Sequence, residues 1–95
     1  MDKTGTKLEI KLFNGRNNFI LWQSTVKDML IQQGLYATLE EKKPTNVDNT
    51  KWEDMKLHAA STIQLSLAPE IKYEVLEEDN PKILWEKLIK TYNSN

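Results

Sequence analysis

The chain has no cysteine, one histidine and one arginine among its 95 residues. Without cysteine it can form no disulfide, no thiolate nucleophile and no cysteine-based zinc site. A lone histidine, His58, cannot supply the roughly four donors that a structural zinc ion needs. There are only three glycines, and none lies in a phosphate-binding loop or a nucleophile-elbow motif. We therefore expect no metal site, no cofactor, no catalytic residues and no enzyme activity.

The sequence also lacks an excess of either charge. Thirteen Lys and Arg oppose fourteen Asp and Glu, for a net charge of −1, so no general field attracts a polyanion. No run of about 18 apolar residues could span a bilayer, and the first ten residues lack the apolar core of a signal peptide. We expect no membrane association, no direct nucleic-acid binding by this segment, and a location in the reducing cytoplasm.

What is present is helical periodicity, most clearly between Phe13 and Gly34. Apolar residues recur here at three- and four-residue steps, which is typical of one face of a helix. Asn17 or Asn18 can cap the start of this helix, and Gly34 suits the left-handed residue after its end. The predicted helix covers about residues 18–33.

Further start and stop signals divide the rest of the chain. Thr50 and Glu53 have the spacing of a capping box. Pro69 suits a helix start, although Ala68 before it is a poor cap, so this junction is either a kink or a clean break. Asn80 followed by Pro81 is another start signal. The helices predicted after the first one cover about residues 35–40, 51–67, 69–78 and 81–92.

Ahead of these helices, about residues 1–16 are predicted to form an arm. Leu8, Ile10 and Leu12 alternate with charged residues between Lys7 and Phe13, as in a half-buried extended segment. No second alternating run offers a partner strand. The arm therefore lies across the helices or pairs with another copy of the chain.

Together these patterns predict one all-α domain over residues 1–95, a small bundle of four to five short helices with an extended N-terminal arm. The three tryptophans could form a ligand cage or stack bases, but their spacing favours a shared core. Base stacking in nucleic-acid binding is usually accompanied by interleaved Arg and Lys, and this chain has a single arginine. The predicted core anchors are Phe19, Trp22, Val26, Met29, Trp52, Ile63, Leu84, Trp85, Leu88 and Tyr92.

Some apolar residues do not belong to these core stripes, namely Ile20, Leu21 and Ile31 on the first long helix and Leu57 and Leu65 on the next. A helix that is apolar over more than half its circumference is central in a bundle or buries a second face against a partner. The candidate assembly interface is one line of positions away from Trp22, formed by Ile20, Ser24, Lys27 and Ile31.

Three stretches, in order along nearly the whole chain, resemble the amino-terminal Gag segment of copia-type LTR retrotransposons. The first, FNGRNNFILWQSTVKDMLIQQGL, has that family's Phe-Asn-Gly, Asn-Phe, Trp and Met-Leu positions. The second, HAASTIQLSLAPEIKYEV, has its Ala-x-x-x-Ile-x-x-Ser-Leu pattern. The third, NPKILWEKLIKTYNSN, has its Leu-Trp-x-x-Leu-x-x-x-Tyr ending. This sequence differs from the family at Asn80-Pro81-Lys82 and Ala68-Pro69, positions where the family itself varies. The resemblance therefore does not fix where the helices end at these two junctions.

The resemblance implies a capsid amino-terminal domain, similar to those of retroviral capsids, that assembles with copies of itself into virus-like particles around the element RNA. It also implies that the chain is a fragment of a longer Gag protein. The missing parts would be a second, C-terminal capsid domain and, in many members, an RNA-binding zinc knuckle.

Two other readings remain open. The chain could be a host protein domesticated from Gag, acting as a helical adaptor for a partner protein or peptide. Direct nucleic-acid binding, which would weaken steeply with salt, fits the neutral charge least.

Overall fold

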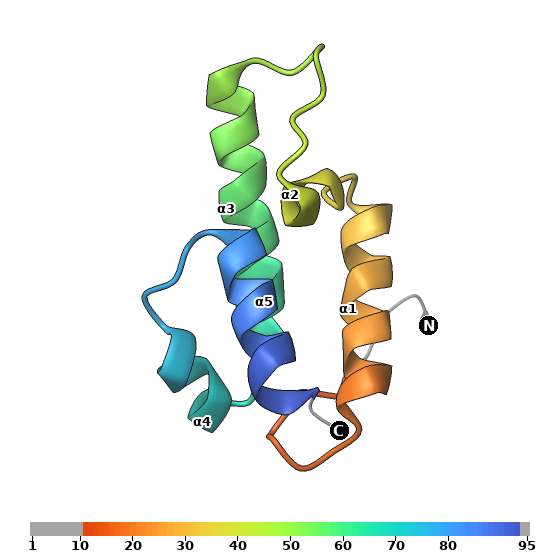
Figure 1. Cartoon of the computed structure of the whole chain (residues 1–95), viewed down its shortest axis with the longest axis vertical. Coiled ribbons are helices and arrows are strands. Elements are labelled where there is room, and N and C mark those ends of the chain that lie inside the picture. Colours follow the sequence, from red (N-terminus) through yellow and green to blue (C-terminus); the bar gives the residue numbers. More distant parts are fainter. Residues whose placement is uncertain (1–10, 94–95) are drawn as a thin grey trace, which may run out of the picture.

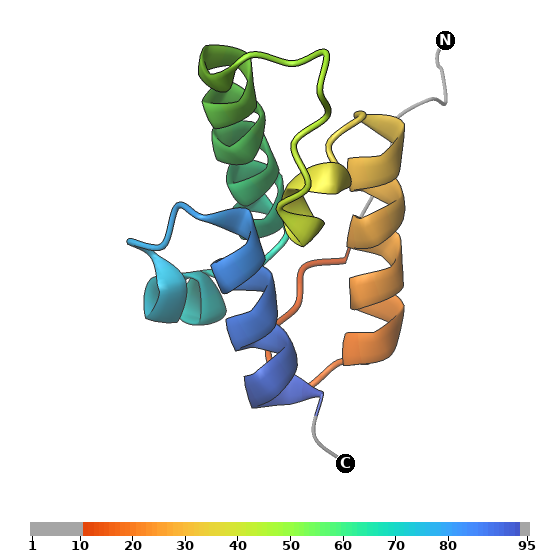
Figure 2. The same ribbon diagram turned by 45° about the horizontal axis from the view of Figure 1, so that its top comes forward.

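A computed structural model describes residues 11–93. Within that range the chain is all-helical, which confirms the predicted fold class (Figure 1). Among these helices none combines the length and hydrophobicity that a bilayer crossing requires. The elements are α1 (Phe19–Gln32), α2 (Ala37–Glu40), α3 (Asn49–Leu65), α4 (Pro69–Lys72), a 3₁₀ turn η1 (Tyr73–Val75) and α5 (Pro81–Tyr92). Helix α5 lies between α1 on one side and α4 on the other (Figures 1 and 2).

The first helix begins and ends where its local sequence predicts. Asn18 is the N-cap, and its side chain accepts a hydrogen bond from the Leu21 amide at 3.0 Å. At the other end Gly34 has φ of +74°, a conformation that glycine adopts without steric cost. The Leu35 amide then donates to the Leu30 carbonyl at 2.8 Å, which closes the helix end and directs the chain back toward the core.

The start of α3 differs from the prediction. Its N-cap is Asp48, whose carboxylate accepts from the Lys51 amide at 2.8 Å, so Thr50 lies inside the helix and the predicted capping box with Glu53 does not form. Asp48 and Thr50 are both able to cap a helix. Capping by Asp48 also places a negative charge at the positive end of the helix dipole. Glu53 instead pairs with Lys56 at 3.1 Å.

Helix α3 also ends earlier than predicted, and a clean break follows. It ends at Leu65 and not at residue 67, because the Ser66 carbonyl accepts the Phe13 amide at 3.1 Å and the Trp22 indole N–H at 2.8 Å. Ala68 is extended, with ψ of 154°, as expected for a residue before proline. Of the two alternatives at this junction, the break is correct.

The helix predicted over residues 69–78 is shorter as well. After α4 and η1 the chain turns away at residue 76. The Gln64 side-chain amide donates to the carbonyls of Val75 and Glu78, both at 3.0 Å. Those carbonyls are thus occupied by α3, and no further helical turn is needed to satisfy them. One consequence is that Leu76, just beyond η1, is 52% exposed.

The predicted arm lies largely outside the described residues, but its last part does not. Phe13, and not Leu12, is the buried residue here: Phe13 is 1% exposed and Leu12 is 41% exposed. Phe13 forms an isolated parallel bridge with Leu67, and its carbonyl accepts from the Ala68 amide at 2.9 Å. The partner of this segment is therefore the connection between α3 and α4.

The core is centred on an aromatic cluster that joins both ends of the chain. The Phe13 ring lies 5.2 Å from that of Phe19, 5.6 Å from Trp22 and 4.9 Å from Tyr92, measured between ring centroids. Trp85 extends the cluster at 5.9 Å from Trp22. The prediction that all three tryptophans meet is wrong: Trp52 is buried, but no ring pair within residues 11–93 includes it. Of the other predicted anchors, Val26, Ile63, Leu84 and Leu88 are buried, and Met29 is partly buried.

Candidate assembly interface

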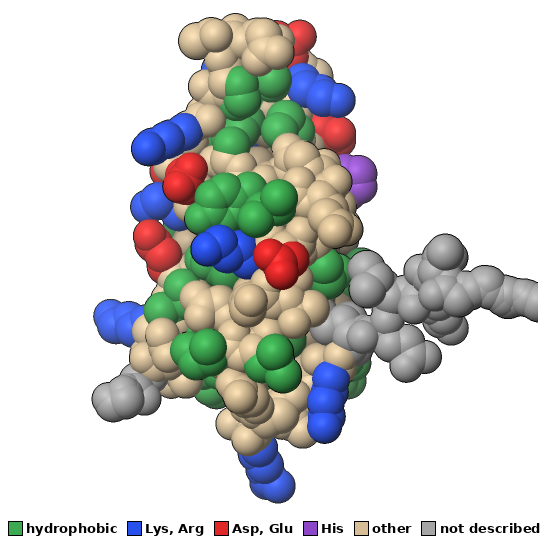
Figure 3. Space-filling view, turned by 90° about the vertical axis from the view of Figure 1, so that its right-hand side faces the viewer, with side chains coloured by type: hydrophobic (Ala, Val, Ile, Leu, Met, Phe, Trp, Pro, Cys, Tyr) green, Lys and Arg blue, Asp and Glu red, His purple; other side chains and the backbone are tan. Residues whose placement is uncertain are grey.

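The outer face of α1 carries three large aliphatic side chains in solvent. Ile20 is 56% exposed, Leu21 is 65% exposed and Ile31 is 50% exposed. The opposite face of the same helix buries Phe19, Trp22, Val26 and Leu30. Figure 3, which looks onto this side of the molecule, shows hydrophobic patches separated by charged side chains. In α1, hydrophobic character therefore extends well beyond what the core uses.

The four residues predicted to form the interface lie together on this outer face. Ile20, Ser24, Lys27 and Ile31 are all exposed, and their spacing of four, three and four residues places them along one line of the helix. The Nζ of Lys27 lies 5.7 Å from the centre of the Tyr36 ring, within reach of a cation–π contact. That another copy binds here stays a prediction.

A network of asparagines holds the amino end of this face in place. The Asn14 side chain accepts from the amides of Arg16 and Asn17 at 2.9 and 3.2 Å. Asn17 accepts from the Asn14 amide at 3.0 Å and donates to the Leu12 carbonyl at 3.0 Å. Such local bonds satisfy backbone groups of this loop. The outer face of α1 is thus presented on a well-anchored helix.

The glycine in this loop is constrained by conformation and by space. Gly15 has φ of +91°, and a Cβ there would lie 3.3 Å from Ile71 Cδ1 and 3.9 Å from Tyr92 Cε1. A side chain would therefore press on Ile71 and lie in ordinary contact with Tyr92, in addition to straining the backbone. The Phe13-Asn14-Gly15 motif thus joins a buried ring, a capped loop and a close approach to α4 and α5.

The interface predicted from the sequence omits several exposed apolar residues, among them Leu21, Tyr73 and Leu76. Leu21 lies off the predicted core stripe and is more exposed than Ile20 or Ile31; its angular position on α1 is the sequence signal that indicates this exposure. Tyr73 at 78% and Leu76 at 52% exposed had no such signal, since their exposure depends on where η1 ends.

His58 lies on the exposed surface of α3. It borders a shallow hollow of about 400 Å³ with Gln33, Leu35 and Leu65. Thr62 in the same hollow donates to the Gln33 side chain at 3.1 Å. Across residues 11–93 no three His, Asp or Glu side chains stand close enough together to hold a metal ion.

Comparison with known proteins gives a similarity to a retrotransposon polyprotein. The chain is 38% identical over 93 residues to the retrovirus-related Pol polyprotein from transposon TNT 1-94 of Nicotiana tabacum. The match lies in the amino-terminal region of that protein and covers 96% of this chain but 7% of the polyprotein. No family model and no solved structure matches. The match supports an origin in a copia-type retrotransposon.

Proposed function

We propose, from the premise of a retrotransposon origin, that this chain is the capsid amino-terminal domain of a Gag protein and that it associates with copies of itself. In this proposal the copies form virus-like particles in the cytoplasm, and the particles enclose the element RNA. The role is structural and requires no catalytic group.

The observation that carries the proposal is the outer face of α1. Exposed aliphatic side chains gathered on one well-anchored helix support the use of this face for protein contacts. Each contact between domains can be small, because many weak contacts around a closed shell add up through multivalency. RNA would be bound elsewhere in a longer protein, since the charge of this chain is −1.

The polyprotein match is consistent with this role. The chain spans only a small part of its relative, so further segments, including a second capsid domain, would follow it in a complete Gag protein. Such a domain would be the partner of this one within the same chain.

Electron microscopy of the protein extended through its second domain tests the proposal. We expect shells or tubes from the wild-type sequence and few or none from the double variant Ile20→Asp, Ile31→Asp. Helicity measured by circular dichroism should be unchanged, because both side chains are half exposed. The control is Lys51→Asp, Thr91→Asp, which changes two exposed residues outside α1. Normal particles from the Ile20, Ile31 variant would show that this face is not the interface.

A further inference from the structure

A second apolar surface lies away from α1, in a groove between α3 and the segment after η1. Leu57 and Leu65 of α3 are 55% and 68% exposed, and Leu76 across the groove is 52% exposed. These residues border a hollow of about 260 Å³ together with Gln64, Lys72 and Asp79. The groove has aliphatic walls and a charged rim, which is the usual anatomy of a protein-binding site.

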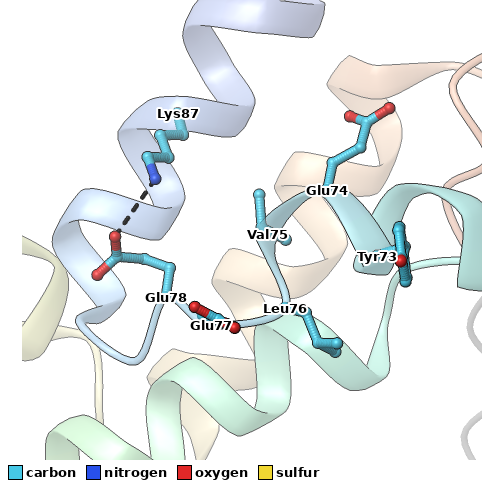
Figure 4. Close-up of a pocket in the computed structure, with 7 residues that line it drawn as sticks. All are labelled: Tyr73, Glu74, Val75, Leu76, Glu77, Glu78 and Lys87. Atoms are coloured by element: carbon cyan, nitrogen blue, oxygen red, sulfur yellow. Dashed lines mark hydrogen bonds and ion pairs between the residues drawn. The ribbon is translucent and has the colours of Figure 1, made fainter.

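The two apolar surfaces lie on different sides of the molecule. In Figures 1 and 2, α1 is on the right and the segment from α4 to the start of α5 is on the left. Figure 4 shows this segment: Glu78 points toward Lys87, with 3.4 Å between Oε1 and Nζ, whereas Leu76 and Tyr73 are directed away from that pair. One copy can therefore use both surfaces at once.

The two sides also carry opposite charge. Residues 11–36, which contain α1, have three cationic residues and one acidic residue, a net charge of +2. Residues 69–80, of which Lys72, Glu78 and Asp79 line the groove, have five acidic residues and one lysine; with Lys87, which pairs with Glu78, the net charge of this side is −3. Opposite charges attract the α1 side of one copy to the groove side of another, and they disfavour pairing of two α1 sides.

We infer that the outer face of α1 in one copy packs into the groove of a second copy, with Ile20, Leu21 and Ile31 against Leu57, Leu65 and Leu76. This inference rests on the proposed function and specifies which surfaces of two copies are in contact. A helix that places a line of aliphatic residues in an apolar groove is an established mode of recognition. Because the two surfaces differ, the contact is head-to-tail, and repeating it gives a ring or an open filament.

The first test uses two blocked variants of the chain in sedimentation at low salt. The α1-blocked variant is Ile20→Asp, Ile31→Asp, and the groove-blocked variant is Leu57→Asp, Leu76→Asp. Each alone should associate at least roughly tenfold more weakly than the wild type. Mixed in equal amounts they should form a dimer and nothing larger, since each retains one working surface. Circular dichroism checks that both are folded.

The second test exploits the absence of cysteine. Single-cysteine variants Ile31→Cys and Leu76→Cys are incubated with a short bis-maleimide cross-linker, alone and mixed. Since both positions are half exposed, neither change disturbs the fold. The mixture should cross-link more than either variant alone, and added salt should reduce the yield.

Two outcomes would overturn the inference. Normal association of the groove-blocked variant, or stronger cross-linking of Ile31→Cys with itself than with Leu76→Cys, would mean that two α1 faces pair. Particle formation by the longer protein would then still support the capsid role. Failure of the wild-type longer protein to form particles would instead count against the proposed function itself.

Discussion

The two faces of α1 have similar residues in very different surroundings. Leu30 is 0% exposed and Ile31, its neighbour, is 50% exposed. Trp22 on the inner face donates its indole N–H to the Ser66 carbonyl, whereas Ile20 and Leu21 on the outer face meet solvent. The difference shows that the number of hydrophobic residues in a helix does not by itself measure how much the helix stabilises the fold. The inner face stabilises the domain, and the outer face is available to a partner.

The inner face is most directly tested at Trp22. Trp22→Ala removes a ring that contacts Phe13, Phe19 and Trp85, and it should reduce the free energy of unfolding by about 3–5 kcal/mol. Denaturant titration followed by circular dichroism measures this. Trp22→Phe keeps most of the ring and should lose clearly less. Equal losses would mean that the indole hydrogen bond, and not packing, holds the cluster together.

Adjacent residues give the sharpest comparison of the two faces. Leu30→Ala should cost about 2–5 kcal/mol because it leaves a cavity in a closed core. Ile31→Ala, one position further, should change the free energy of unfolding by no more than about 0.5 kcal/mol. The same titration applies to both. A large loss at Ile31 would place part of the outer face in the fold and weaken its assignment as a contact surface.

The glycines that flank α1 also differ in their surroundings: Gly15 lies against core side chains, whereas Gly34 has open space around it. Gly15→Ala strains the backbone and presses on Ile71, so it should cost about 1–3 kcal/mol. Gly34→Ala meets no atom within 4 Å and should cost only about 1 kcal/mol, from its left-handed conformation alone. Thermal unfolding of both variants measures the order. If Gly34→Ala were the more harmful, space near the core would not be what selects glycine at position 15.

The smallest effect concerns pH and the inner cluster. Burial, followed by the 2.9 Å hydrogen bond to Glu74, raises the pKa of Tyr92 above its ordinary value of 10.0. Because the pKa is raised in the folded state, the protonated Tyr92 hydroxyl contributes to the stability of the fold. This contribution is complete below pH 10 and is lost as pH rises through the folded pKa. Tyr92→Phe should therefore flatten part of the alkaline decline in stability, measured by denaturant titration at several pH values.

The control for this change is Tyr73→Phe, at a side chain that is 78% exposed. If the two variants gave the same pH profile, Tyr92 would not be the source of the slope.

Features set by local chemistry could be predicted from the sequence. The Asn18 cap, the turn at Gly34 and the start of α5 at Pro81 each depend on bonds or conformations within a few residues. For the same reason the all-helical class was predicted, since helical periodicity is a local property.

Features set by distant contacts could not be predicted in this way. Phe13 is buried because Leu67 bridges to it, and η1 ends because Gln64 occupies the carbonyls of Val75 and Glu78. Asp48 and Thr50 are both able to cap a helix, and nothing in the local pattern decides between them. The α1 face of the candidate surface could be found from periodicity, whereas the exposed Leu76 of the groove could not.

The Ser66 carbonyl, which accepts from both Phe13 and Trp22, has a consequence for the order of folding. The indole of Trp22 and its acceptor are 44 residues apart in sequence. During synthesis from the amino end, α1 is complete well before that acceptor has been made. Isolated helices of this length are marginal in water, so the amino-terminal half must await the α3–α4 connection. We expect nascent chains that stop before Ser66 to remain sensitive to protease, and chains that extend through α5 to become resistant.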